Sequence, residues 1–180
     1  VVDQLSEGQR KSFVKVENIF TTCKAFVEKF GMKKQDLAEE IIEYAKLFRK
    51  HLGADVLDIR VPQHFGIKRI SCLINATKSY AAIPYVLYVL NTVKDEKERN
   101  QIFGFLEIYL MRRILSKSTN NNYSDLFSEN LISQRIQTYA DLVSYIAKKD
   151  GSSLSMPQLS EIRKSLNNNK FDETTARIIY

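Results

Sequence analysis

Apolar residues recur at steps of three and four through most of this 180-residue chain, and that spacing constrains the fold more than any other feature. Between Phe13 and Phe30, for example, Val16, Phe20 and Val27 share one face of an α-helix that we expect to pack on a core. Turn-forming residues are scarce, with only 6 Gly and 3 Pro, which disfavours a sandwich or a barrel. The sequence therefore predicts an all-α fold, an irregular multi-helix bundle of about seven to eight helices.

Glycine, proline and capping patterns predict where these helices begin and end. Gly31 and Gly53 are typical helix stops, and Asp36 followed by Glu39 is typical of a capping box, so the first two helices should form an antiparallel hairpin. Pro84 suits the first turn of a buried central helix. The segments expected to be helical are 13–30, 36–52, a short stretch from 67, 84–90, 95–115, 132–146, 155–166 and a last one from 172.

A length of 180 residues favours one domain, so we expect a single helical domain over residues 1–180, in which residues 54–66 interrupt the helical pattern as an irregular crossing segment. In one interpretation residues 152–180 form a separate C-terminal sub-region of it. The helix that Asp172 would cap has hardly completed a turn at Tyr180, and we therefore expect the chain to be excised from a longer protein.

The overall charge is compatible with a nucleic-acid partner but does not require one. The 27 basic and 21 acidic residues give a net charge of +6, spread along the whole length. Cys23 and Cys72 lie far apart without a metal-spaced neighbour, which favours a reduced, cytoplasmic protein. The longest apolar stretch, residues 80–90, is too short for a membrane span, so we expect no membrane partner. Nothing in the sequence sets the oligomeric state.

No pattern of catalytic or metal-binding residues occurs in the sequence. The only histidines, His51 and His64, lie outside any metalloprotease or hydrolase spacing, and no phosphate-binding loop or dinucleotide motif is present. Glu39, Glu40 and Glu43 fit a solvated helix start better than a metal site. We expect no catalytic residue, no cofactor and no metal in this chain, with a metal-free helical enzyme that uses Glu and Tyr side chains left open.

Arg112, Arg113 and Lys117 are the best candidates for a contact with DNA. They fall at the end of the helix expected at 95–115, just before a polar loop, where guanidinium groups and amides can hold a phosphate. In the alternative interpretation, one arginine pairs with an acid such as Glu107 and the other lies in solvent at the helix end.

The run from Ala76 to Phe127 resembles part of a known family. It reads Ala-Thr-Lys-Ser-Tyr-Ala-Ala-Ile-Pro-Tyr-Val-Leu, then Phe-Leu-Glu-Ile-Tyr-Leu-Met-Arg-Arg-Ile-Leu, then Asn-Tyr-Ser-Asp-Leu-Phe. A Pro-bearing apolar helix before a helix that ends in Arg-Arg resembles the helical region after the N-terminal ParB-like domain of the GmrSD-type modification-dependent restriction endonucleases. The run from Leu154 to Leu166 and the Arg-Ile-Ile-Tyr ending resemble that family's next segments, which lead towards its C-terminal HNH nuclease domain.

The resemblance implies a non-catalytic part of a DNA restriction and antiviral defence protein. The intact protein would be an NTP-dependent endonuclease, but the nuclease motif is missing here, and Glu7-Gly8-Gln9-Arg10 lacks the Asp and the second Gln of the family's nucleotide motif. We hypothesise a helical domain that links an NTPase-type sensing domain to a nuclease domain, with flanking domains of the same polypeptide as partners and DNA contact through the basic cluster. The alternative is a helical protein–protein interaction module unrelated to nucleic acid.

Overall fold

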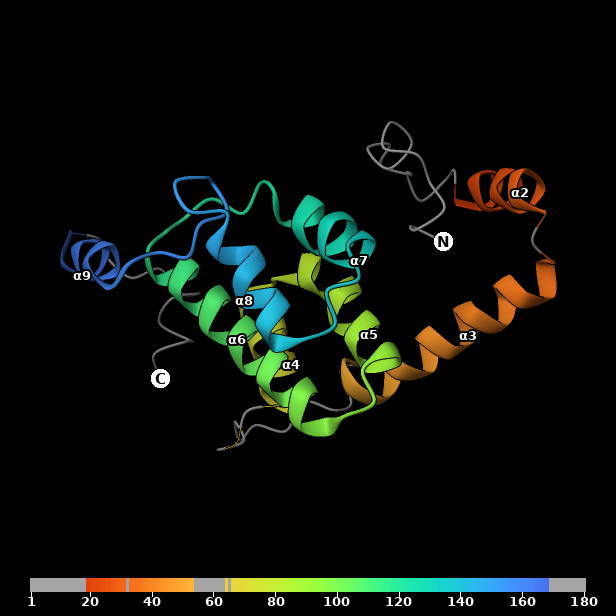
Figure 1. Ribbon diagram of the computed structural model, residues 1–180, viewed down its shortest axis with the longest axis horizontal. Coiled ribbons are helices and arrows are strands. Elements are labelled where there is room, and N and C mark those ends of the chain that lie inside the picture. Colours follow the sequence, from red (N-terminus) through yellow and green to blue (C-terminus); the bar gives the residue numbers. More distant parts are fainter. Residues whose placement is uncertain (1–18, 32, 54–63, 65, 169–180) are drawn as a thin grey trace.

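The computed structural model of the chain describes residues 19–31, 33–53, 64 and 66–168. Eight α-helices and no strand lie within those ranges, which confirms the predicted all-α class. Figure 1 shows a helical body, formed by the helices α4 to α8, with an arm projecting from one side of it. The arm consists of α2 (Ile19–Phe30) and α3 (Lys34–His51), and α9 (Leu159–Asn168) lies at the opposite side of the body.

The centre of the body is α5 (Ile83–Thr92), as its nearly all-round apolar sequence predicts. Tyr85, Val86 and Val89 are fully buried, and a proline occupies the first turn, where its missing amide costs no helical bond. The 3-10 turn Tyr80–Ala82 leads into α5.

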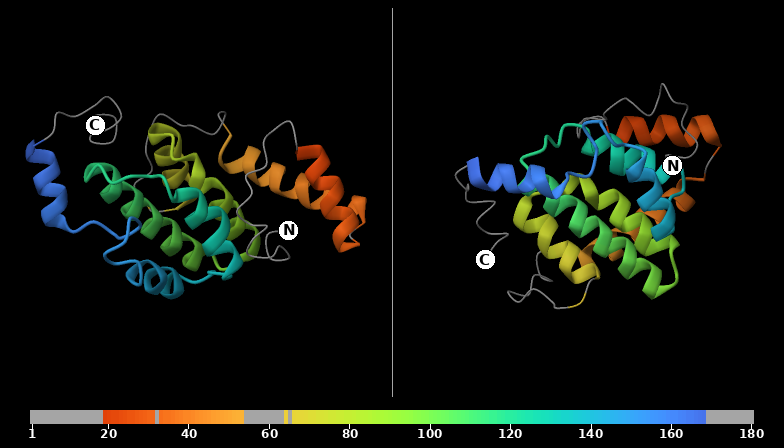
Figure 2. Two further views of the ribbon diagram at one scale, coloured as in Figure 1. Left: turned by 90° about the horizontal axis from the view of Figure 1, so that it is seen from above. Right: turned by 60° about the vertical axis from the view of Figure 1, so that its left-hand side comes forward.

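α5 contacts two of the longer helices directly. It packs against α3 and against α6 (Glu96–Leu115), and α6 packs in turn against α4 (Ile67–Thr77) and α8 (Tyr139–Ala147). Buried residues from α4, α5, α6 and α8 belong to one continuous hydrophobic core, to which α3 contributes none. Figure 2 shows the same arrangement from two further sides, with the arm and α9 at opposite ends.

The start of α6 lies where it was predicted, but only half of the predicted capping box is used. The Asp95 side chain accepts a hydrogen bond from the backbone N–H of Lys97 at 3.1 Å. Glu98, which would have closed the box, instead accepts a hydrogen bond from the backbone N–H of Tyr139. Glu98 therefore joins α6 to the start of α8.

The single helix predicted at 132–146 is wrong, because the structure has two helices there. A π-helical turn at Asp125–Asn130 continues into the one-turn α7 (Leu131–Ser133), and Arg135 then takes a left-handed conformation with φ of 53°. After this break the hydroxyl of Thr138 caps α8 by accepting from the N–H of Asp141 at 3.1 Å.

The break contains a local turn, in which the N–H of Ile136 donates to the carbonyl oxygen of Leu131 at 3.0 Å, and a tertiary hydrogen bond. The hydroxyl of Tyr85, buried in α5, donates to the carbonyl oxygen of Ile136 at 2.9 Å. Ile136 lies in the connection between α7 and α8. It therefore fits the apolar period of the segment without being helical.

The arm differs from the predicted antiparallel hairpin. Gly31 ends α2 in the left-handed conformation, as predicted, but α2 and α3 then diverge as a V that meets at its outer end (Figures 1 and 2). The Asp36 capping box is not used, since α3 begins at Lys34 after Lys33, which makes no side-chain capping bond. The stripe expected on a core is only partly covered, since Phe26 is 8% exposed whereas Phe20 is 80% exposed.

Beyond α8, the helix predicted from 155 begins later, at Leu159. The carboxylate of Glu161 accepts a hydrogen bond from the N–H of Gln158 at 2.6 Å, and Ile162 is buried while Leu159 is 58% exposed. The predicted helix from 172 and the motif at 7–10 lie outside the described residues. Within the described ranges, no helix is both long and apolar enough to cross a bilayer.

Candidate functional site

Arg113, one of the three predicted DNA contacts, lies inside the body with 1% of its side chain exposed. Its Nε donates to the hydroxyl of Tyr123 at 2.9 Å, and its Nη1 donates to the carbonyl oxygen of Ser155 at 2.9 Å. Its Nη2 donates to the carbonyl oxygens of Ser153, at 2.7 Å, and Thr119. We call this set of bonds the Arg113 clamp. It ties the end of α6 to the loop that follows and to the connection between α8 and α9.

The groups that bind the positively charged guanidinium of Arg113 in the clamp are neutral. The rings of Tyr109 and Tyr123 lie 5.5 and 5.2 Å from the guanidinium carbon of Arg113, a distance at which a cation is attracted to a ring face. Three carbonyl oxygens and one hydroxyl accept its hydrogen bonds, which suits the five fixed donors of a guanidinium. The role of Arg113 is therefore to position the chain around it.

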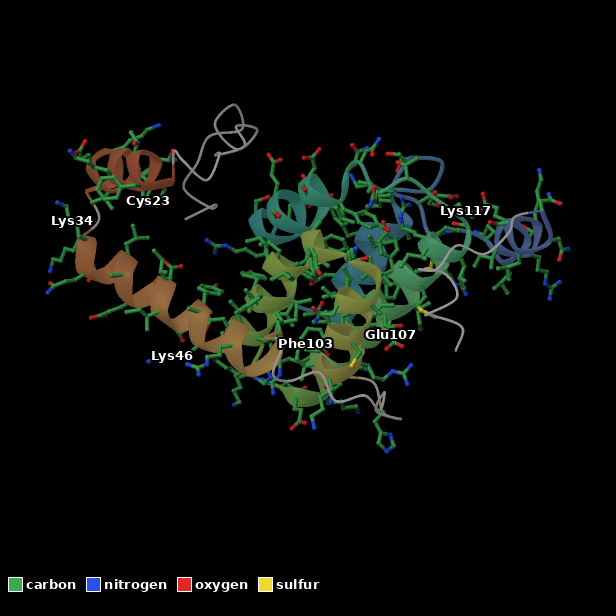
Figure 3. The ribbon with its side chains drawn as sticks, turned by 180° about the vertical axis from the view of Figure 1, so that it is seen from behind. Cys23, Lys34, Lys46, Phe103, Glu107 and Lys117 are labelled. Atoms are coloured by element: carbon green, nitrogen blue, oxygen red, sulfur yellow. The ribbon has the colours of Figure 1, made fainter. Side chains whose placement is uncertain are left out.

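The structure divides the predicted basic cluster. Arg112 is half-buried, with its Nη1 3.4 Å from the carbonyl oxygen of Pro157. Lys117 is exposed just beyond α6, where its backbone is left-handed (Figure 3). Arg113 is bound within the clamp and cannot reach a phosphate. The predicted DNA contact therefore stays a hypothesis for Arg112 and Lys117.

The alternative pairing of a cluster arginine with Glu107 is wrong. Glu107 is buried and accepts hydrogen bonds from Nε of Arg69 at 2.9 and 3.1 Å, and one more from Nη2. This bonding to Glu107 raises the pKa of the Arg69 guanidinium, since it favours the charged form. Arg69 belongs to α4, so the ion pair joins α4 to α6 within the body.

The described histidines and cysteines lie in four separate segments of the chain. His51 ends α3, where burial lowers its pKa, and His64 is exposed. Across the described residues, no three His, Cys, Asp or Glu side chains gather in a group that could hold a metal ion. Cys23 on α2 and Cys72 on α4 are both half-buried. The hollows described next are lined mainly by apolar side chains.

One hollow is an open groove of about 750 Å³ along the outer face of α6. Phe105 and Ile108 line it, and Tyr139 from α8 closes one side with its ring edge-on to Phe105 at 6.1 Å. Its rim is polar, and Ile108 and Tyr139 are 42% and 39% exposed.

The second hollow lies on the arm, between the two helices of the V. We call it the notch; its volume is about 370 Å³. It is lined by Phe20, Cys23, Lys24, Val27, Lys34, Leu37, Ala38 and Ile41. Figure 3 places Cys23 and Lys34 at the outer end of the arm, far from Lys117 on the body. The notch is thus separated from the predicted basic cluster by the width of the molecule.

The arm also exposes more large apolar side chains than its size would suggest. Eight such side chains are exposed in the described structure, and four of them are on the arm: Phe20 (80%), Ile41 (54%), Ile42 (52%) and Phe48 (41%). None of the 18 residues of α3 is buried.

These exposed residues follow a regular pattern on α3. Ala38, Ile41, Ala45 and Phe48 are all exposed and are spaced by three, four and three residues. That spacing places them in one line along the helix, as at the contact positions of a coiled coil. We call this line the seam.

Sequence reasoning found the apolar residues of the arm but assigned them to the core. A stripe at helical spacing indicates that one face of a helix is apolar, whatever covers it. Two features of the sequence could have indicated a binding surface on α3. The seam alternates alanine with a large apolar residue, and Ile42 is a large apolar residue outside the stripe.

Comparison of the chain with known protein families, with curated proteins and with solved structures gives no match.

Proposed function

We propose that this chain is a non-catalytic helical interaction module that binds a helix of a polypeptide through its arm. The observation that carries this proposal is an 18-residue helix that buries none of its residues while it exposes an apolar seam. Most of the stability of a helix in a protein comes from the packing of its apolar face against other elements. Exposed apolar patches on a folded protein are typical of interaction sites, and a helix laid against an apolar groove is a common binding mode.

The inner end of the arm is held on the body by a hydrogen bond and by burial. This attachment supports a role for the arm in presenting a binding surface to a partner. The hydroxyl of Ser71 on α4 donates to the carbonyl oxygen of His51 at 2.6 Å, and Leu52 beside it is only 4% exposed. The middle of α3 also packs against α5, where Tyr44 is half-buried beside Asn91. The arm is therefore held at one end and along one flank, and its seam and notch are accessible.

A photo-activated cross-linking residue at position 41, in cells that express the chain natively, tests this proposal. Ile41 lies on the seam, so we expect one defined polypeptide to be trapped there. The same cross-linker at Lys50, an exposed residue on the opposite face of α3, is the matched control. Equal labelling from positions 41 and 50 would refute an interaction through the seam.

The resemblance to restriction endonucleases supports a second candidate, in which the module is the middle helical domain of a cytoplasmic restriction protein. The residues that carry the resemblance, 76–127, form the centre of the body, including α5 and α6. Arg112 and Lys117 keep their charges at or near the surface next to this region. Under this candidate, the flanking domains of the same polypeptide are partners and DNA touches these two residues.

Binding of a labelled duplex, followed by fluorescence anisotropy at several salt concentrations, tests the DNA contact. Contact with phosphates predicts affinity that falls steeply as salt rises, and a loss of that affinity in Arg112→Glu/Lys117→Glu. Lys148→Glu, at an exposed lysine beyond α8, is the charge-matched control for one substitution. Binding that is absent, or unchanged by the double substitution, would remove DNA from the proposal.

A further inference from the structure

We propose that the arm binds a second copy of this chain, with the two α3 helices antiparallel about a twofold axis level with Glu43. This inference rests on the proposed function, because it names the partner of the same seam and notch. Three features of the arm carry it: the order of large and small residues in the seam, the shape of the notch, and the distribution of charge along α3.

The seam is complementary to itself only when the helices are antiparallel. Positions 38 and 48, like positions 41 and 45, lie equally far on either side of Glu43. Antiparallel pairing at this level therefore sets Ala38 against Phe48 of the other copy, and Ile41 against Ala45. Each layer then joins a small side chain to a large one, which lets the helix axes approach closely while the layer is filled. Parallel pairing in register would instead set alanine against alanine.

The notch offers a place for the largest residue of the seam. Phe48 is 41% exposed on its own copy, so its ring is available for a partner. In the antiparallel pair it lies level with Ala38, which lines the notch together with Phe20 and Val27 of α2. The aromatic ring of each copy thereby enters the apolar notch of the other, and both copies contribute equally, as twofold symmetry requires.

The flank of the seam that faces away from α5 fits the same geometry. Gln35, Ile42 and Arg49 are exposed and follow one another at intervals of seven along this flank. In an antiparallel pair, equivalent flanks face one another. Ile42 then meets Ile42 of the second copy near the axis, which accounts for an isoleucine 52% exposed, and Gln35 lies close to Arg49 of the second copy.

Charge along α3 is separated into an acidic half and a basic half. The segment 34–43 carries Asp36, Glu39, Glu40 and Glu43 with a single lysine, whereas the segment 44–51 carries Lys46, Arg49 and Lys50 with no acid. Antiparallel pairing places the acidic half of each copy beside the basic half of the other. Parallel pairing would place like charges together, at separations where salt screens them only in part.

Analytical ultracentrifugation of the full chain between about 1 and about 300 µM provides the first test, since this range spans micromolar dissociation constants. We expect a monomer–dimer equilibrium within it. A wild-type chain that stays monomeric throughout would overturn the inference. The cross-linking experiment at position 41 separates the two proposals: a different trapped protein supports the arm as an interaction site and refutes self-association.

Two charge variants test the pairing geometry. Gln35→Lys sets a lysine beside Arg49 of the second copy twice per dimer, and we expect its dissociation constant to rise at least about tenfold. An equimolar mixture of Gln35→Lys with Arg49→Glu should form heterodimers, because the new lysine then faces the new glutamate. Lys50→Glu, on the far face of α3, is the control and should raise the dissociation constant much less than Gln35→Lys does, because its side chain points away from the second copy. A mixture no tighter than Gln35→Lys alone would contradict the antiparallel register.

Filling the notch tests the docking of Phe48 independently. Ala38→Trp occupies the notch with a ring of its own copy and should prevent dimerisation, whereas Ala25→Trp, at an exposed position on another face of α2, should not. Circular dichroism of both variants checks that they remain folded. A folded Ala38→Trp chain that dimerises as well as Ala25→Trp would exclude the notch from the interface.

Discussion

Arg112 and Arg113 are neighbours in sequence but lie in different environments, because consecutive residues of an α-helix point about 100° apart. Arg113 shares its face of α6 with Tyr109, which is fully buried, whereas Arg112 shares its face with Ile108, which is 42% exposed. A sequence pattern that contains both arginines therefore mixes a packing residue with a surface residue. Arg112 and Arg113 differ in burial only because the other elements of the body pack against one side of α6.

Replacing Arg113 should destabilise the fold far more than replacing its neighbour. In Arg113→Met three carbonyl oxygens and the Tyr123 hydroxyl lose their donors in the interior, so we expect the free energy of unfolding to fall by about 3 kcal/mol. In Arg112→Met it should change by less than about 0.5 kcal/mol. Urea denaturation followed by circular dichroism measures both values. Similar values for the two variants would refute the clamp as a stabilising element.

Buried tyrosines should make the fold sensitive to alkaline pH. Burial raises the pKa values of Tyr85, Tyr109 and Tyr123 above the usual value for tyrosine. Their hydroxyls therefore stay protonated in the folded chain at pH values where the unfolded chain ionises them. The stability they contribute is fully present below about pH 10 and is lost as the pH rises above it.

The ultraviolet absorbance of tyrosinate tests this expectation. Part of the absorbance change should appear only together with the loss of helical circular dichroism, because the buried hydroxyls of Tyr85, Tyr109 and Tyr123 ionise when the chain unfolds. In Tyr85→Phe the unfolding free energy should depend less steeply on pH above 10, although the lost bond to Ile136 lowers it by about 1 kcal/mol at neutral pH. Complete ionisation of a chain that remains fully helical would show that these tyrosines are accessible.

Helix ends in this chain often use left-handed residues that are not glycine. Lys78 at the end of α4, Lys117 beyond α6 and Arg135 after α7 all have φ near 55°, a conformation that costs a non-glycine residue about 1 kcal/mol or more. Each of them ends or follows a helix, so each fixes the direction in which the chain leaves. The elements of the body are therefore joined by connections that carry some strain.

Substitution by glycine should raise the free energy of unfolding at Lys78 and lower it at Lys97, because the two residues have different backbone conformations. Lys78 is exposed and left-handed, so Lys78→Gly should raise the free energy of unfolding by up to about 1 kcal/mol. Lys97 is exposed within the first turn of α6, so Lys97→Gly should lower it by about 0.5 to 1 kcal/mol. Thermal and urea unfolding of both variants supply the values. A decrease for both would mean that Lys78 forms contacts that outweigh its backbone strain.

The whole molecule combines a closed body with an open arm. The body has a continuous core around α5 and α6, whereas α3 has no buried residue. Packing of this kind makes local opening costly in the body and easy in the arm. The two parts should therefore differ in stability although they belong to one chain.

Hydrogen exchange measured by mass spectrometry should reveal that difference. At low micromolar concentration, amides in the outer half of α3 should exchange at least about tenfold faster than those in α5 and α6, because few contacts oppose their opening. Protection of α3 should increase with protein concentration if the arm pairs with a second copy. Uniform protection of arm and body at low concentration would show that the arm is stabilised by something other than association.

The sequence by itself determined the fold class and the positions of most helices. The three-and-four spacing around α5 and α6, Pro84 at a helix start, and Gly31 and Gly53 at helix ends depend on the chain within a few residues, so they could be predicted. The break between α7 and α8 could not, since its turn at the left-handed Arg135 has no glycine or proline to mark it, and the bond from Tyr85 to Ile136 at the break joins residues fifty-one positions apart.

Tertiary structure alone decided which apolar and charged residues are buried. Periodicity shows that Phe20 and Ile41 lie on apolar helix faces, but whether another helix covers those faces depends on the angle at which α2 and α3 diverge. The same holds for Arg113, whose burial requires carbonyl oxygens from residues about forty positions further along the chain. Burial and hydrogen bonding between distant segments depend on where those segments meet in space, and local sequence patterns do not determine such long-range contacts.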